Sequence, residues 1–314
     1  MHKEYAVNPE EICRSWERFR FFWGQCGFAR GRLIARFPGK WKRSVFRSDT
    51  FNALSPIRQK RIEDLLAKDG SRMVASQREY DKSSGTWLGA AISAHQAKPF
   101  HAIIDEENPG MHPKVLFFDD VDEATELWKS DTSAQVRRTS AALGQCTRQL
   151  LSSGRMVKII DPYFSFKREF TGPLKEFLTH LLPYVSRLES LEIHFKYSQH
   201  ARNYDWQDFE QRLRSDIINK RRFYLPADGD ALFQKLVFHA WEDSDVETLH
   251  ARCILTELGG MQFERGLDSA SQSEAVSLVS LMSEDDVKDY HARYTPPESP
   301  FTLKGSFRAS ELIR

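Results

Sequence analysis

The fold of the second half of this chain is decided by residues 156–164, which read Met156-Val157-Lys158-Ile159-Ile160-Asp161-Pro162-Tyr163-Phe164. The first five form a short, mostly apolar run that is typical of a buried β-strand. Pro162 then favours the end of the strand, because the residue before a proline is restricted and the proline has no N–H to donate. Asp161 and Tyr163 are therefore expected just beyond the carboxyl end of a strand, where open α/β sheets bind their ligands.

Helical and strand-like patterns alternate around this segment. Helical patterns are present in three stretches, 133–151, 173–182 and 206–218. Short runs typical of strands lie at 191–195, 236–238 and 251–255. Alternation of this kind predicts an α/β fold in which helices pack against the faces of a sheet.

A second group of polar residues lies in His250-Ala251-Arg252 and in the glycine-containing stretch 259–268. His250 and Arg252 are two residues apart, so on a strand both side chains point to the same face. Asp161 and Arg265 are expected after strand ends, where loops gather ligands. We therefore expect these four side chains at one edge of the sheet, with both arginines within reach of a single phosphate-sized anion.

Together these motifs resemble the C-terminal phospholipase D-like domain of MIT-domain proteins, over residues 133–268. That family shows an Asp-Pro-Tyr strand end, a His-x-Arg strand, a glycine turn and a Gly-Arg-Gly-Leu-Asp ending. This chain departs from the pattern at three positions. Ala251 stands where the family often has an acid, Gly260 replaces an aromatic residue, and Glu264 replaces the first glycine of the ending.

The resemblance implies a phospholipase D-like mixed sheet flanked by helices. It also implies a module that binds anionic phosphoinositide membranes without hydrolysing them and without a cofactor. The residues implied to bind phosphate or lipid are Asp161, Tyr163, His250, Arg252, Arg265 and Asp268. Structural roles remain open beside this one: His250 could be bonded to Asp161 or Asp268 in the core, Asp161-Pro162 could be a plain turn, and Arg265 could pair with an acid.

The wider phospholipase D superfamily uses two His-x-Lys motifs, in which one histidine attacks phosphorus and the other protonates the leaving oxygen. We place one related motif in the region of resemblance, with Arg252 at the lysine position, where it can still hold phosphate through two hydrogen bonds. The same His-x-Arg motif recurs at His291-Ala292-Arg293, in an acid-rich helical stretch. An enzymatic alternative is a phosphodiesterase or nuclease acting on nucleic acid, in which each protomer of a homodimer supplies His250 to a shared site.

The first third of the chain is predicted to be a smaller, mostly helical domain. Helical patterns are present at 9–22, 55–70 and 87–97, and strand-like runs follow at 98–104 and 112–118. Turn residues at 108–110 suggest a boundary. We therefore expect a basic N-terminal α+β domain over 1–110, a phospholipase D-like domain over 111–294 and a mobile polar tail over 295–314.

The N-terminal region is basic, because residues 1–60 contain 13 Lys/Arg and 5 Asp/Glu. Within it, residues 28–47 carry seven basic side chains and no acid, interleaved with aromatic residues. This pattern is typical of segments at anionic membrane interfaces, and also of grooves that bind single-stranded nucleic acid. A third interpretation is a solvated face whose aromatic side chains belong to the core. The residues expected in a membrane patch are Arg36, Lys40, Trp41, Lys42 and Arg43.

The formal net charge of the whole chain is +1, and its four cysteines show neither a CxxC pair nor zinc spacing, so no metal is expected. The sequence shows no signal peptide and no long apolar run, which predicts a cytoplasmic protein that is at most peripheral at a membrane surface. The predicted function is a sensor or recruiter that binds an anionic phospholipid membrane and acts with a partner protein. Such a sensor would also fit a defence or stress-sensing operon, so a role in antiviral defence is a further hypothesis.

Overall fold

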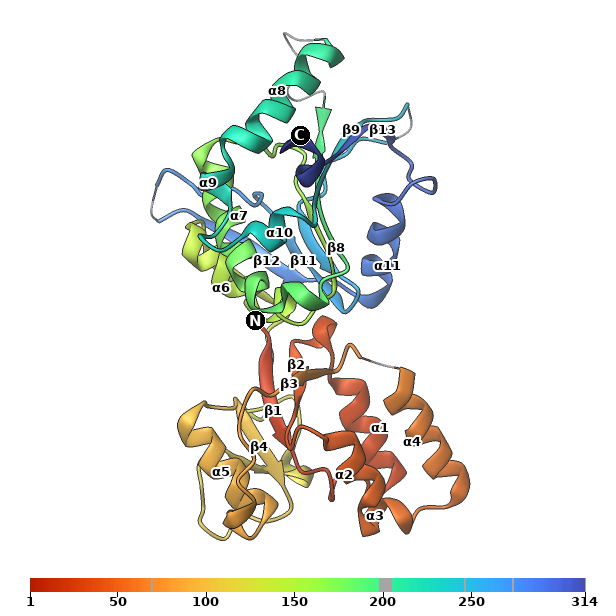
Figure 1. Ribbon diagram of the computed structural model, residues 1–314. Helices are drawn as coiled ribbons and strands as arrows, with labels where there is room; N and C mark the ends of the chain where they lie inside the picture. The colour runs from red at the N-terminus through yellow and green to blue at the C-terminus, as the bar shows by residue number, and fades with distance from the viewer. Residues whose placement is uncertain (69, 198–204, 246, 273, 314) are drawn as a thin grey trace. The chain divides into compact units, whose positions relative to one another are not determined.

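The computed structural model describes residues 1–68, 70–197, 205–245, 247–272 and 274–313 of the chain. They form two compact units, Met1–Thr132 and Ser133–Arg314 (Figure 1). Each unit has a sheet and a hydrophobic core of its own. Among the described residues, no helix is long and apolar enough to cross a membrane.

The N-terminal unit is built on a sheet of parallel strands in the order β3-β2-β1-β4-β5. These strands are β1 (Lys3–Val7), β2 (Arg32–Arg36), β3 (Met73–Ala75), β4 (Ala102–Asp105) and β5 (Val115–Phe117). The helices of this unit are α1 (Trp16–Gln25), α2 (Trp41–Arg47), α3 (Asp49–Asn52), α4 (Pro56–Lys68) and α5 (Trp87–Ala97). The side chains of Ser15, Ser48 and Thr86 cap α1, α3 and α5 by accepting hydrogen bonds from backbone N–H groups of the first turn.

Both faces of this sheet are buried. Tyr5 and Val7 face the core that includes side chains of α1 to α4, whereas Ala6 faces a second core formed with α5. Figure 1 shows α1 to α4 on one side of this sheet and α5 on the other. Strands buried on both faces read as continuous apolar runs without alternation. The expected α+β domain is therefore corrected to a parallel α/β unit. Its strands, three to five residues long, are too short to stand out from the sequence.

The boundary between the units lies later than residue 110. Both β4 and β5 pair within the N-terminal sheet. Trp128 packs into the core of this unit, and its backbone carbonyl accepts a hydrogen bond from the Tyr5 hydroxyl. The segment after β5 is held by this packing, so the N-terminal unit extends to Thr132.

The C-terminal unit contains a mixed sheet in the order β13-β9-β8-β7-β10-β11-β12-β6. Its strands are β6 (Ser133–Arg137), β7 (Met156–Ile160), β8 (Ser190–Lys196), β9 (Leu236–Glu242), β10 (Cys253–Thr256), β11 (Gly259–Phe263), β12 (Val276–Leu281) and β13 (Thr302–Arg308). The central strands β7, β8 and β9 are parallel, and the other pairs are antiparallel. The predicted α/β fold, with a mixed sheet and flanking helices, is confirmed at this level.

The helices of this unit are α6 (Ser140–Leu151), α7 (Arg168–Leu181), α8 (Trp206–Asn219), α9 (Arg221–Tyr224), α10 (Asp230–Phe233) and α11 (Glu284–Arg293). Figure 1 shows α11 on one side of the sheet and α6, α7 and α9 on the other. The helix expected over 133–151 begins only at Ser140, because residues 133–137 form the edge strand β6 and Thr139 caps the helix.

Residues 302–313 do not form a polar tail. Residues 302–308 form β13, which pairs with β9 at the edge of the sheet, and Phe307 and Ala309 are buried. Polar and apolar residues alternate along β13, since one face packs on the unit and the other meets solvent. The expectation of a mobile polar tail over 295–314 is therefore wrong for residues 302–313.

Candidate functional site

Asp161 lies at the carboxyl end of β7, as predicted, and is 2% exposed. Its Oδ1 accepts a hydrogen bond of 2.9 Å from the backbone N–H of Tyr163, and its Oδ2 accepts one of 2.9 Å from that of Leu267. The Leu267 bond ties the end of β7 to the turn at Gly266. A Cβ at Gly266 would lie 2.9 Å from Asp268 Oδ1 and 3.1 Å from Asp161 Oδ2, and its φ is 99°. Glycine is therefore needed where the two carboxylates approach the turn.

Arg252 reaches the same turn. Its Nη1 donates a hydrogen bond of 3.0 Å to the backbone carbonyl of Glu264, and its guanidinium lies 5.1 Å from the centre of the Tyr163 ring. Burial raises the pKa of Asp161 to about 6, against the opposing effects of the two backbone N–H groups and the Arg252 charge. Burial outweighs these favourable contacts, because the Asp161 carboxyl group has little access to the water that would otherwise stabilise its charge.

Asp268 and Arg265 differ in their surroundings. Asp268 forms an ion pair of 2.6 Å with Arg138, whose guanidinium is largely buried. The backbone N–H of Arg265 donates to Ser277 Oγ, while its side chain is exposed and takes part in no hydrogen bond or ion pair among the described residues. The structure thus brings Asp161, Tyr163, Arg252 and Asp268 together around Gly266. The Arg265 side chain, by contrast, is exposed to solvent.

His250 is exposed and precedes β10, which begins only at Cys253. The prediction that His250 and Arg252 lie on a strand is therefore wrong, because strand pairing with β7 starts opposite Ile160, at Cys253. No hydrogen bond among the described residues involves the His250 side chain. The carboxylates of Asp161 and Asp268 are occupied by backbone N–H groups and by Arg138, so the described contacts do not include a bond from either of them to His250.

Two further histidine motifs have structural roles. His291 lies on α11, where its Nε2 contacts the Thr256 carbonyl at 3.1 Å, and Arg293 pairs with Asp289. A His-x-Lys string missed in the sequence, His194-Phe195-Lys196, lies on β8. His194 is 1% exposed and has both ring nitrogens engaged, so it cannot attack phosphorus.

The expected membrane patch is only partly at the surface. Trp41 is fully buried, and its indole N–H donates a hydrogen bond of 2.7 Å to the Val7 carbonyl at the end of β1. Lys42 donates to the backbone carbonyl of Leu66, and burial lowers its pKa. Trp41 is thus a core residue and is corrected as such, whereas Arg36, Lys40 and Arg43 are exposed.

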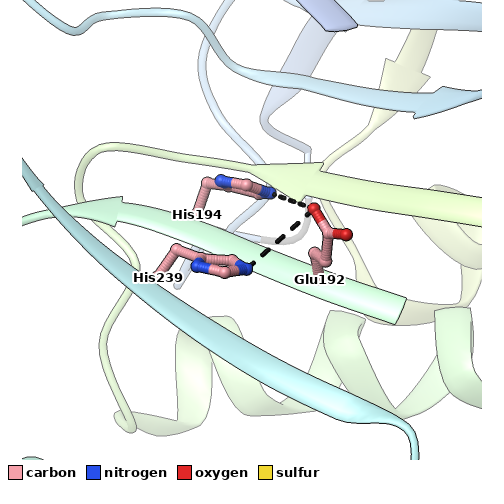
Figure 2. Close-up of side chains that lie close together, drawn as sticks. All are labelled: Glu192, His194 and His239. Carbon is pink, nitrogen blue, oxygen red and sulfur yellow. Dashed lines mark hydrogen bonds and ion pairs between the residues drawn. The ribbon is translucent and has the colours of Figure 1, made fainter. Parts of the chain in front are cut away.

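A second cluster, which the sequence did not reveal, lies on the central strands β7, β8 and β9 of the C-terminal sheet. Glu192 Oε2 is 3.0 Å from His194 Nε2, 3.1 Å from Lys158 Nζ and 4.0 Å from His239 Nε2, as Figure 2 shows for the two histidines. Burial alone would raise the pKa of Glu192, but the His194 hydrogen bond and the neighbouring positive charge lower it to about 2. The spacing Glu192-x-His194-x-Lys196 was the available signal, since it places three ionisable side chains on one strand face.

The cluster has the donor atoms of a metal site but not the charge or tautomer of one. The indole N–H of Trp241 donates to His194 Nδ1 at 3.0 Å, which places the proton of the neutral ring on Nε2. A protonated Nε2 donates to Glu192 and cannot ligate a metal. The Lys158 ammonium also occupies the cation position beside Glu192, with further hydrogen bonds to Tyr294 O and Thr295 Oγ1. The described residues therefore favour a buried ion pair here.

The raised pKa of Asp161 predicts a specific pH dependence. Ionising this group costs more in the folded chain than in the unfolded chain, so its contribution to stability is complete below its unfolded pKa of 3.8 and is lost as the pH rises through about 6. We expect wild type to lose about 3 kcal/mol relative to Asp161→Asn between these limits. Urea unfolding of both proteins across this range measures it, because groups common to both cancel. A pH-independent difference would contradict the prediction.

No protein-family model matches the chain, and no curated protein matches it in sequence. Among solved structures, it is similar to Nuc from Salmonella typhimurium, a phospholipase D family member, with 7% identity over 55% of this chain and 96% of that chain and a TM-score of 0.32. It is also similar to an archaeal chromatin protein described with a novel mode of DNA binding, with 13% identity and a TM-score of 0.28. The likeness to that protein covers 54% of this chain and 52% of the other. Both TM-scores are too low to establish a shared fold.

Proposed function

We propose that the Ser133–Arg314 unit is a non-catalytic, phospholipase D-like module that binds the phosphate groups of anionic phospholipids at a membrane surface. The observation that carries the proposal is the placement of Arg252 at the strand-end turn, held by the Glu264 carbonyl and the Tyr163 ring. One of its five N–H donors is used by Glu264, and a phosphate oxygen pair can accept two others. Arg265 is exposed on the same turn and supplies a second positive charge.

The surroundings of His250 support binding rather than hydrolysis. A histidine that attacks phosphorus must be held in the correct orientation and tautomer by a second group. His250 is exposed, and among the described residues no acid is bonded to it. Its exposure is also what the alternative requires, since a homodimeric nuclease would pair two such histidines from different protomers. The binding module would act as a sensor or recruiter with a partner protein, a role that would fit antiviral defence.

Substitution of Arg252 tests the proposal. Arg252→Ala removes a charge-assisted contact worth about 1.5–3 kcal/mol, so affinity for phosphoinositide-containing vesicles should fall by a factor of about 10 to 150. Arg252→Lys should recover part of this affinity, because a lysine keeps the charge but not the paired hydrogen bonds. Vesicle flotation measures both. The matched control is Arg222→Ala, which removes an exposed arginine of α9.

The same proteins decide between the two functions. Unchanged vesicle binding by Arg252→Ala, with Arg222→Ala as reference, would refute Arg252 as the headgroup contact. Hydrolysis of bis-p-nitrophenyl phosphate or plasmid DNA that is abolished by His250→Ala would refute the non-catalytic module and support the nuclease. A gel shift with single-stranded DNA that is lost in Arg252→Ala would assign the site to nucleic acid instead of lipid.

A further inference from the structure

A row of polar side chains crosses the α11 face of the C-terminal sheet, separate from the turn at Gly266. Ser306 of β13 lies directly opposite His239 of β9 in the strand register, and Ser306 Oγ is 2.8 Å from His239 Nδ1. On the other side of the ring, His239 Nε2 is 4.0 Å from Glu192 Oε2. The order along the row is therefore hydroxyl, imidazole, carboxylate, in which each group faces the next.

Glu192 sets the proton position on His239. The Glu192 carboxylate is ionised and is held by His194 at 3.0 Å and by Lys158 at 3.1 Å. A proton on His239 Nε2 faces this negative charge, so the neutral ring is stabilised with Nδ1 free of a proton. Nδ1 can then accept the hydroxyl proton of Ser306. Burial lowers the pKa of His239 to about 4, so the ring is neutral at pH 7, and the Glu192 charge acts in the opposite direction by favouring the protonated ring.

We propose that Ser306, His239 and Glu192 form a serine-nucleophile site that transfers acyl groups from esters to water. Ser306 Oγ bonds to the ester carbonyl carbon while its proton moves to His239 Nδ1. The bond from that carbon to the alcohol oxygen then breaks, and His239 protonates the leaving alcohol. Water next gives a proton to His239 and its hydroxyl to the acyl carbon, and Ser306 leaves with that proton restored. The net reaction is ester and water to acid and alcohol.

The location of Ser306 suits this chemistry. Its side chain is exposed, and β13 is the first strand in the sheet order, so no described strand pairs with its outer edge. Edge strands present unpaired backbone N–H groups, which are the donors that stabilise the negative oxygen of an acyl-transfer intermediate. The distance of 4.0 Å between His239 and Glu192 is longer than a hydrogen bond, and such contacts tighten when substrate binds. Glu192 is thus a positioning residue.

Covalent labelling of the full-length protein tests this site. A fluorophosphonate probe should form a bond from Ser306 Oγ to phosphorus with release of fluoride, because His239 removes the hydroxyl proton. Peptide mass spectrometry should find the adduct on residues 302–308, and Ser306→Ala should lack it. His239→Gln should slow labelling by at least about 100-fold, the usual lower bound for general-base assistance. Turnover of p-nitrophenyl acetate should fall in parallel.

Two controls keep the outcomes distinct. Ser310→Ala removes a nearby, partly exposed serine outside the row and should label like wild type. Glu192→Gln should change the pH profile of labelling, whereas a purely structural role would lower the melting temperature and leave that profile unchanged. The site is refuted if Ser306 carries no adduct, or if His239→Gln labels at the wild-type rate while circular dichroism shows that it is folded.

Discussion

Replacement of Glu192 by alanine is expected to lower the free energy of unfolding of the C-terminal unit by about 3–5 kcal/mol, the cost of breaking a buried ion pair. The Lys158 side chain is 5% exposed and would lose the carboxylate that lies 3.1 Å from its ammonium. Its remaining partners, Tyr294 O and Thr295 Oγ1, are neutral. His194 would lose its acceptor as well. Urea unfolding of the variant measures the loss.

A double variant without either charge separates the ion pair from simple loss of packing. Lys158→Met combined with Glu192→Leu removes both charges and keeps the volume, so the double variant should be markedly more stable than Glu192→Ala. Equal destabilisation of the two proteins would show that the charge of Lys158 does not cause the loss. If the cluster around Glu192 bound a metal ion instead, added Zn²⁺ would raise the melting temperature of the wild-type protein.

Trp41→Ala is expected to destabilise the N-terminal unit by about 3–5 kcal/mol, the usual range for removing a fully buried large aromatic side chain. The indole is 0% exposed, packs in the core that includes side chains of α1 to α4, and caps the Val7 carbonyl at the end of β1. A tryptophan inserted in a membrane would behave differently, since its removal would weaken vesicle binding and leave folding intact. Thermal unfolding and vesicle flotation of the same variant distinguish these roles.

The matched variant changes the exposed cations beside Trp41. Charge reversal at Arg36, Lys40 and Arg43 should leave the melting temperature nearly unchanged, because solvated charges contribute little to stability. If this surface contacts anionic lipid, binding should weaken by at least about 1 kcal/mol for each reversed charge at low salt, because each reversal removes a cation and adds an anion. Unchanged vesicle binding would remove the N-terminal segment from the proposed membrane surface and leave the Arg252 turn as the contact.

Local sequence patterns were sufficient for the framework of the C-terminal unit. The apolar run before Asp161 and the alternation of helical and strand-like segments predicted the strand β7 and a sheet flanked by helices, whereas the mixed strand directions were expected only from the family resemblance. Pro162 placed Asp161 at the strand end, where it lies. These features depend on side-chain spacing within a few residues, which can be determined from the sequence alone.

Tertiary structure decided which partner each of these side chains meets. Spacing by two puts Glu192 and His194 on one face of β8, but the approach of Lys158, His239 and Ser306 depends on strands paired across the sheet. In the same way, the basic and aromatic pattern around Trp41 is common to a membrane surface and a core. Only the packing of α2 against the end of β1 buries the indole. Burial and strand order arise from contacts between residues far apart in sequence, whereas local periodicity specifies only the direction in which a side chain points.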